Sequence, residues 1–101
     1  MQRFFLKYRI LEYPLLDGRL SVRHLSLYMA LVYCHEKGGF CNPVWIQRGE
    51  VMKLSRIQSR QTFYQCLKDL SSFGYISYLP SYDHVSGGLV YLRKWTRREV
   101  P

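Results

Sequence analysis

Residues 59–75, SRQTFYQCLKDLSSFGY, decide how this chain folds. Ser59 can cap a helix, because its hydroxyl accepts a hydrogen bond from an orphan backbone N–H in the first turn. Gly74 can end that helix, because glycine adopts the left-handed C-terminal conformation without steric penalty. Between them, apolar side chains recur at helical spacing and predict a single buried stripe. The stripe consists of Phe63, Cys66, Leu67, Leu70 and Phe73.

The opposite face of this predicted helix, over residues 59–73, is polar. Its side chains are Arg60, Gln61, Tyr64, Gln65 and Lys68, with Asp69 as the only acid, late in the helix. Cations, amides and a phenol suit the base edges and phosphates of a nucleic acid. On the helix alone the simpler interpretation is a polar face that only meets water, because such faces are common.

The residues around this helix favour the first interpretation. Residues 75–80 are rich in aromatic and β-branched side chains and predict a strand, followed by a loop at 81–88 and a second strand at 89–92. Residues 47–55 fit another helix, and 56–58 a turn with Ile57 in the core. Two helices joined by a short turn and followed by a hairpin predict a winged helix-turn-helix, a mainly α fold with a small β-hairpin (α+β). The core candidates of the other helix are Val51, Met52 and Leu54.

A further helix is predicted from Ser21, its N-cap, to about Glu36, because Gly38 and Gly39 follow directly. Residues 25–34 are almost all apolar, so we expect this helix to be buried on more than one side, by the N-terminal segment or by a second copy. His24 and His35 flank it, and a structural role is the commoner one for such histidines. Residues 40–47 suggest a short strand that joins the hairpin.

The two ends of the chain are harder to interpret. Residues 1–14 fit a strand or a helix equally well. We expect residues 1–20 to form an extension that packs on the domain or on a dimer partner, residues 21–92 to form the DNA-binding domain, and residues 93–101 to form a basic tail. Arg93, Lys94, Arg97 and Arg98 surround Trp95 there, which suits a phosphate backbone but also a frayed terminus.

Composition limits the classes of function. A chain of 101 residues with 48% hydrophobic residues is one domain, and its formal net charge of +8 favours an anionic partner. No apolar run approaches the ~20 residues that span a bilayer, so no membrane partner is expected. Lys7 and Arg9 interrupt the apolar N-terminus, so a signal peptide is not predicted and a cytoplasmic location is.

Cysteine usage and the acids argue against a disulfide framework, a metal, a cofactor or an enzyme. Three cysteines are an odd number, and Cys34, Cys41 and Cys66 lack the paired C-x₂-C spacing of structural zinc sites. Cys66 lies on the apolar stripe as a small hydrophobe. Cys34 and His35 are adjacent, so their side chains diverge on a helix and do not form a nucleophile–base pair. No paired carboxylates and no glycine-rich phosphate loop are visible.

Several of these segments resemble a family of short winged-helix transcriptional regulators carried on bacterial conjugative and mobilisable elements. The similarity covers residues 20–92 and is strongest in the serine-led helix and in Gly74-Tyr75-Ile76 after it. It implies DNA binding. The chain departs from the pattern at the tip of the hairpin, where Asp83 and His84 stand in place of a basic residue. The segments that carry the resemblance are residues 25–31, 42–43, 51–57, 59–64, 66–70, 74–76, 78–81 and 88–91.

The sequence therefore predicts a sequence-specific double-stranded DNA-binding protein, a regulator of a mobile element that works as a homodimer through its N-terminal segment and residues 21–36. Arg60 is the candidate for guanine, and Gln61 and Gln65 for adenine. The alternatives are an accessory protein in excision, mobilisation or replication initiation, and a protein–protein interaction module. The candidate DNA-binding residues are Arg48, Lys53, Arg56, Gln58, Ser59, Arg60, Gln61, Thr62, Tyr64, Gln65, Lys68, His84, Arg93 and Lys94.

Overall fold

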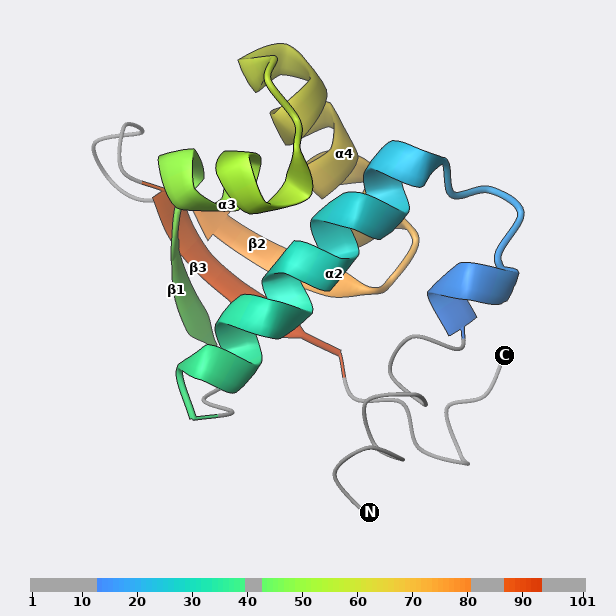
Figure 1. Cartoon of the computed structure of the whole chain (residues 1–101). Helices are drawn as coiled ribbons and strands as arrows, with labels where there is room; N and C mark the ends of the chain where they lie inside the picture. The colour runs from blue at the N-terminus through green and yellow to red at the C-terminus, as the bar shows by residue number, and fades with distance from the viewer. Residues whose placement is uncertain (1–12, 40–42, 81–86, 94–101) are drawn as a thin grey trace.

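The computed structural model describes residues 13–39, 43–80 and 87–93, and these form an α+β domain (Figure 1). One helical turn at residues 13–16 precedes the first long helix. The predicted helices and the two hairpin strands are confirmed, and so is the short strand expected within residues 40–47. The elements in chain order are α2 (Val22–Lys37), β1 (Val44–Gln47), α3 (Arg48–Ser55), α4 (Arg60–Ser72), β2 (Ile76–Pro80) and β3 (Gly87–Leu92).

The three strands form one antiparallel sheet in the order β1-β3-β2, so the last strand lies in the middle. The helices cover one face of this sheet (Figure 1). Side chains alternate between the two faces, as a period of two requires. Val44, Ile46 and Val90 point into the core, whereas Trp45 and Leu79 remain exposed on the other face.

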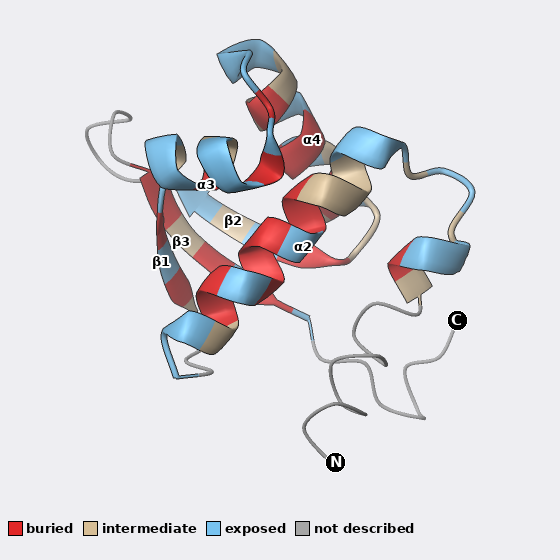
Figure 2. Ribbon diagram, viewed as in Figure 1, coloured by how far each residue is buried: buried red, intermediate tan, exposed pale blue. Residues whose placement is uncertain are grey.

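The core lies between α2 and the sheet, with α3 and α4 closing its end (Figure 2). Tyr28 and Phe63 are its largest fully buried side chains. On the side of α2 away from the sheet, Met29 and Tyr33 are 55% and 52% exposed, so burial of this second side by the N-terminal segment or by a second copy stays a prediction. Leu54, predicted for the core, is 41% exposed because it lies on the outer side of the last turn of α3.

Local signals set the ends of the helices. Ser59 caps α4 by accepting a hydrogen bond from the backbone N–H of Thr62 at 3.3 Å. At the other end Gly74 has φ +87°, and the Tyr75 N–H donates to the Leu70 carbonyl at 2.9 Å, as in a Schellman motif. The same motif ends α3, but there the left-handed residue is Arg56, with φ 64°. The turn between α3 and α4 therefore places a cation where glycine is the usual residue.

Two glycines belong to β3 rather than to the loop predicted at residues 81–88. Gly87 pairs with Gln47 of β1, and Gly88 pairs with Pro80 of β2. A Cβ atom on Gly87 would lie 2.0 Å from the Ile46 carbonyl oxygen, and one on Gly88 would lie 2.2 Å from the Leu79 carbonyl oxygen. The glycines therefore allow the central strand to approach both neighbours where the hairpin begins.

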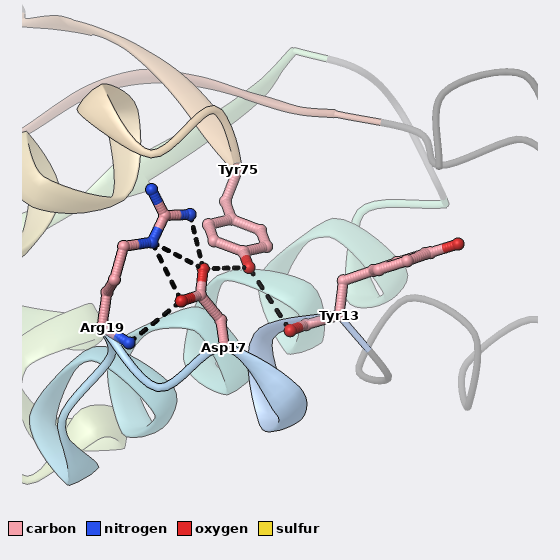
Figure 3. A network of polar contacts seen from close by, with 4 residues as sticks. All are labelled: Tyr13, Asp17, Arg19 and Tyr75. Carbon is pink, nitrogen blue, oxygen red and sulfur yellow. Dashed lines mark hydrogen bonds and ion pairs between the residues drawn. The ribbon is translucent and has the colours of Figure 1, made fainter. Parts of the chain in front are cut away.

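Residues 13–20 are attached to the domain by a polar cluster (Figure 3). The Asp17 carboxylate accepts hydrogen bonds from the backbone N–H and the guanidinium of Arg19, at distances between 2.6 and 3.2 Å. The Tyr75 hydroxyl, at the start of the hairpin, lies 2.8 Å from Asp17 Oδ2 and 3.3 Å from the Tyr13 carbonyl oxygen. The hydrogen bonds from Arg19 hold the pKa of Asp17 well below its usual range.

We expect Asp17→Asn to lower the free energy of unfolding by ~1–2 kcal/mol at pH 7, because a tyrosine hydroxyl and a guanidinium lose their charged acceptor. A carboxyl with a depressed folded-state pKa stabilises the fold above its unfolded pKa, about 3.9 for aspartate, and this stabilisation disappears as pH falls through the folded value. The difference between variant and wild type should therefore shrink below pH 4. Urea melts between pH 2.5 and 7 measure it.

Glu50→Gln is the control, because Glu50 is 46% exposed and its ion pair with Lys37 is long, at 3.7 Å. Such surface pairs contribute little, so its unfolding free energy should stay within ~0.5 kcal/mol of wild type. Parallel pH profiles for wild type and Asp17→Asn would show that the carboxylate of Asp17 does not stabilise the fold.

Candidate nucleic-acid interface

Much of α3, of the turn at residues 56–59 and of the first turns of α4 is exposed, at the top of the view in Figure 2. An open hollow of about 920 Å³ lies along α3 and this turn. Its lining residues mix apolar side chains with two cations. They are Gly49, Met52, Lys53, Leu54, Arg56, Ile57 and Gln58.

Four exposed cations on these elements form what we call the basic face: Lys53, Arg56, Arg60 and Lys68. Within the part of the chain that the structure describes, none of the four makes an ion pair. Their charges are therefore available to an anion from outside the chain.

The acids of the same helices are paired with residues of α2. Glu50 lies 3.7 Å from Lys37 Nζ, and Asp69 Oδ2 lies 2.8 Å from His24 Nε2. Hydrogen bonds from His24 and then Gln65 hold the pKa of Asp69 below its usual range, so this carboxyl is ionised at neutral pH. Along α3 and α4 both acids thus have partners on α2, whereas the cations of the basic face have no acidic partner among the described residues.

The polar residues of α4 differ in how free they are. Arg60 and Gln61 are exposed, and no contact within the described residues holds their side chains. Gln65, the other candidate for adenine, is also exposed, but its Nε2 donates to Asp69 Oδ1 at 2.9 Å, so one side of this amide is already held within the chain. Tyr64 is half-buried, with its ring edge-on to Phe63 at 5.3 Å between centroids.

The other predicted DNA-binding residues that the structure describes are less available than Arg60 and Gln61 or lie outside the first turns of α4. The Ser59 oxygen is occupied by the cap of α4, and Thr62 is half-buried. Arg48 is half-buried at the start of α3. Burial raises the pKa of Tyr78, and the positive charge of Arg48 offsets part of this rise. Gln58 is exposed in the turn. Arg93 is exposed after β3, and its N–H donates to the Tyr75 carbonyl.

Some predicted residues cannot be compared. His84 and Lys94 lie outside the described residues, as do residues 1–12 and Cys41. Cys34 and Cys66 are buried free thiols, and burial raises the pKa of each. Within residues 13–39, 43–80 and 87–93, no three His, Cys, Asp or Glu side chains are grouped so that they could hold a metal ion.

Sequence reasoning missed His24 as a neighbour of the site. The sequence identifies it only as one of two histidines that flank helix 21–36 and indicates no partner for it. It lies 45 positions before Asp69, and no spacing rule joins residues that far apart.

Comparison with family models, with curated proteins and with solved structures finds no match to this chain. None of the described helices has the length and hydropathy needed to traverse a lipid bilayer.

Proposed function

We propose that this chain binds double-stranded DNA sequence-specifically, with α4 in the major groove, and regulates transcription from a mobile element. The observation that carries the proposal is the basic face, whose four cations have no ion pair among the described residues while Glu50 and Asp69 are paired with α2. Free Lys and Arg side chains arranged along two consecutive helices suit the phosphates on both sides of a groove.

The arrangement of the elements supports the same proposal. Helix α4 follows α3 after the turn at 56–59, and a second helix placed in this way is the one that enters the major groove in helix-turn-helix proteins. The antiparallel strands β2 and β3 follow directly, so we interpret the fold as a winged helix-turn-helix with these two strands as its wing. At the N-terminus of α4, Arg60 would contact guanine and Gln61 adenine.

The test is a titration of a labelled duplex with the protein at salt concentrations from about 50 to 300 mM. Contacts with ~4–6 phosphates give a slope of about −4 to −5 when the logarithm of the association constant is plotted against the logarithm of salt concentration. We expect a slope in this range, because four cations of the basic face and Arg48 lie on α3, the turn and α4. A slope near zero would refute DNA binding.

A homodimer is part of the proposal. Leu15, Leu16 and Val22 are 61%, 77% and 82% exposed near the start of α2, and Met29 and Tyr33 are exposed further along it. Burial of these side chains by a second copy would remove apolar surface from water. Selection of bound sequences from a random DNA pool tests this step, because a two-fold symmetric dimer selects a palindrome. A single non-palindromic motif would indicate a monomer.

An accessory role in excision, mobilisation or replication initiation would use the same surface. The choice of a regulator rests on the resemblance of the sequence to regulators of mobile elements. A reporter gene placed behind the selected motif distinguishes the two roles, because only a regulator changes transcription on its own.

A protein–protein interaction module is the second candidate, and the outer face of the sheet favours it. Trp45, Leu79 and Tyr91 are 51%, 52% and 40% exposed there, and Leu89 pairs with both Trp45 and Leu79 to form an apolar row across the sheet. Apolar association is not weakened by salt. Binding of a protein partner that persists at 1 M salt, together with no salt-dependent binding of DNA, would favour this function.

A further inference from the structure

A chain of hydrogen bonds runs from the start of α2 to the exposed face of α4. The Ser21 backbone N–H donates to His24 Nδ1 at 2.8 Å. His24 Nε2 lies 2.8 Å from Asp69 Oδ2, and Gln65 Nε2 lies 2.9 Å from Asp69 Oδ1. The last residue of this chain, Gln65, belongs to the surface that we propose contacts DNA.

The Ser21 backbone N–H fixes the direction of the other hydrogen bonds in this series. A backbone N–H can only donate, so His24 Nδ1 carries a lone pair and the neutral ring holds its proton on Nε2. That proton goes to Asp69. An ionised carboxylate only accepts, so Gln65 must turn its NH₂ group towards Asp69. The carbonyl oxygen of the Gln65 amide, Oε1, is then the atom left to face outwards.

We propose that Asp69 is a positioning residue for sequence recognition, because it orients Gln65 to select a base that carries an exocyclic amino group. This inference rests on the proposed function. In the major groove adenine N6 and cytosine N4 are donors, whereas guanine and thymine offer acceptors at the corresponding positions. Adenine suits Gln65 best, because its N7 can also accept the second N–H of Nε2.

His24 holds the Asp69 carboxylate in place and so keeps the Gln65 amide in this orientation. The His24 side chain is only 12% exposed, and its ring packs edge-on to Phe73 with 6.4 Å between centroids. Gln61, one turn earlier on α4, has no such partner among the described residues. Since Gln65 is ordered before it meets a base, it loses less conformational entropy on binding than Gln61 does.

The experiment measures base preference with the full chain and with Asp69→Asn. In the variant, the oxygen of the new amide accepts from His24 and its NH₂ group faces Gln65. Gln65 must then turn its oxygen inwards and present its NH₂ group to the groove. Dissociation constants are measured for a selected duplex and for versions with each base pair replaced. The variant also loses one negative charge and binds all duplexes more tightly, so the ratio between duplexes is the quantity compared.

Wild type should prefer adenine or cytosine at one position by about five- to 150-fold, the range that corresponds to ~1–3 kcal/mol. Asp69→Asn should prefer guanine or thymine there. Gln65→Ala should remove this preference both in wild type and in Asp69→Asn. Gln61→Ala should instead alter the base preference at a different position of the site. Thermal melting monitored by circular dichroism checks that each variant is folded at the assay temperature.

An unchanged preference in folded Asp69→Asn would overturn the inference while leaving the proposed function in place. Absence of salt-dependent binding by wild type would overturn both. If Asp69→Asn does not fold, Asp69→Ala serves instead. It removes the acceptor that fixes the Gln65 amide, so Gln65 can present either its oxygen or its NH₂ group and the preference for adenine or cytosine should weaken. An unchanged preference in folded Asp69→Ala would overturn the inference.

Discussion

Replacing all four cations of the basic face with alanine should weaken binding to duplex DNA by about 10³- to 10⁴-fold at 0.1 M salt. Each cation that contacts a phosphate releases ~0.9 counterion, which corresponds to about an eightfold change in affinity at this salt concentration. The effect is this large because the four side chains are exposed and bound to no acid of the described chain. The slope of affinity against salt should become shallower by about 3 to 4.

The control for this variant removes a cation from α2. Arg23→Ala lowers the net charge without altering the basic face, because Arg23 lies in α2 rather than in α3 or α4. Lys37 is kept, because it pairs with Glu50 of α3. Its slope should equal that of wild type, with an affinity lower by only a few-fold through the weaker overall field. If each removed cation lowers the affinity for DNA by the same factor in both variants, then DNA binds through net charge alone and not through α3 and α4.

Gly87→Ala should lower the free energy of unfolding by about 3 kcal/mol. Gly87 has φ +128°, a conformation that side chains make costly, and its new Cβ would lie 2.0 Å from the Ile46 carbonyl oxygen. β1 would have to move away from β3, which loosens the contact of Val44 and Ile46 with the core. For a domain of this size the midpoint of thermal unfolding should fall by roughly 10–20 °C.

Gly49→Ala is the matched control, because it makes the same chemical change in α3. A Cβ atom on Gly49 meets nothing within 4 Å, and alanine has the higher helix propensity. This variant should be as stable as wild type or more stable by up to ~1 kcal/mol. If Gly87→Ala and Gly49→Ala have the same midpoint of thermal unfolding, then β1 and β3 do not approach as closely at Gly87 as the structure shows.

Helix ends and strand positions were predictable from the sequence because their causes are local. Ser59 and Gly74 act on backbone groups within one turn of themselves, so the limits of α4 can be deduced from seventeen consecutive residues. The apolar stripe was predictable for the same reason, since a period of 3.6 places its members on one side. The prediction for Leu54 was wrong because periodicity alone does not show which turn of a short helix reaches the core.

Contacts between distant residues could not be predicted. Tyr75 meets Asp17 across 58 positions, and Asp69 meets His24 across 45. The sequence predicts a loop at Gly87 and Gly88 because paired glycines usually mark one, and only the three-dimensional pairing shows how closely β3 approaches its neighbours. The candidate site was therefore predicted by residue type, but the constraint on Gln65 depends on a partner in another helix.

The left-handed backbone of Arg56 has a consequence for how this surface would meet a rigid duplex. A residue with a Cβ atom adopts this conformation at a cost of ~1–2 kcal/mol, which glycine would not incur. The hydrogen bonds from Arg56 and Ile57 back to Lys53 and Met52 hold it there. Because these bonds restrain the turn between α3 and α4, much of the spacing between the charges of the two helices is set before the protein meets DNA. The backbone of this turn therefore has little conformational entropy left to lose on binding.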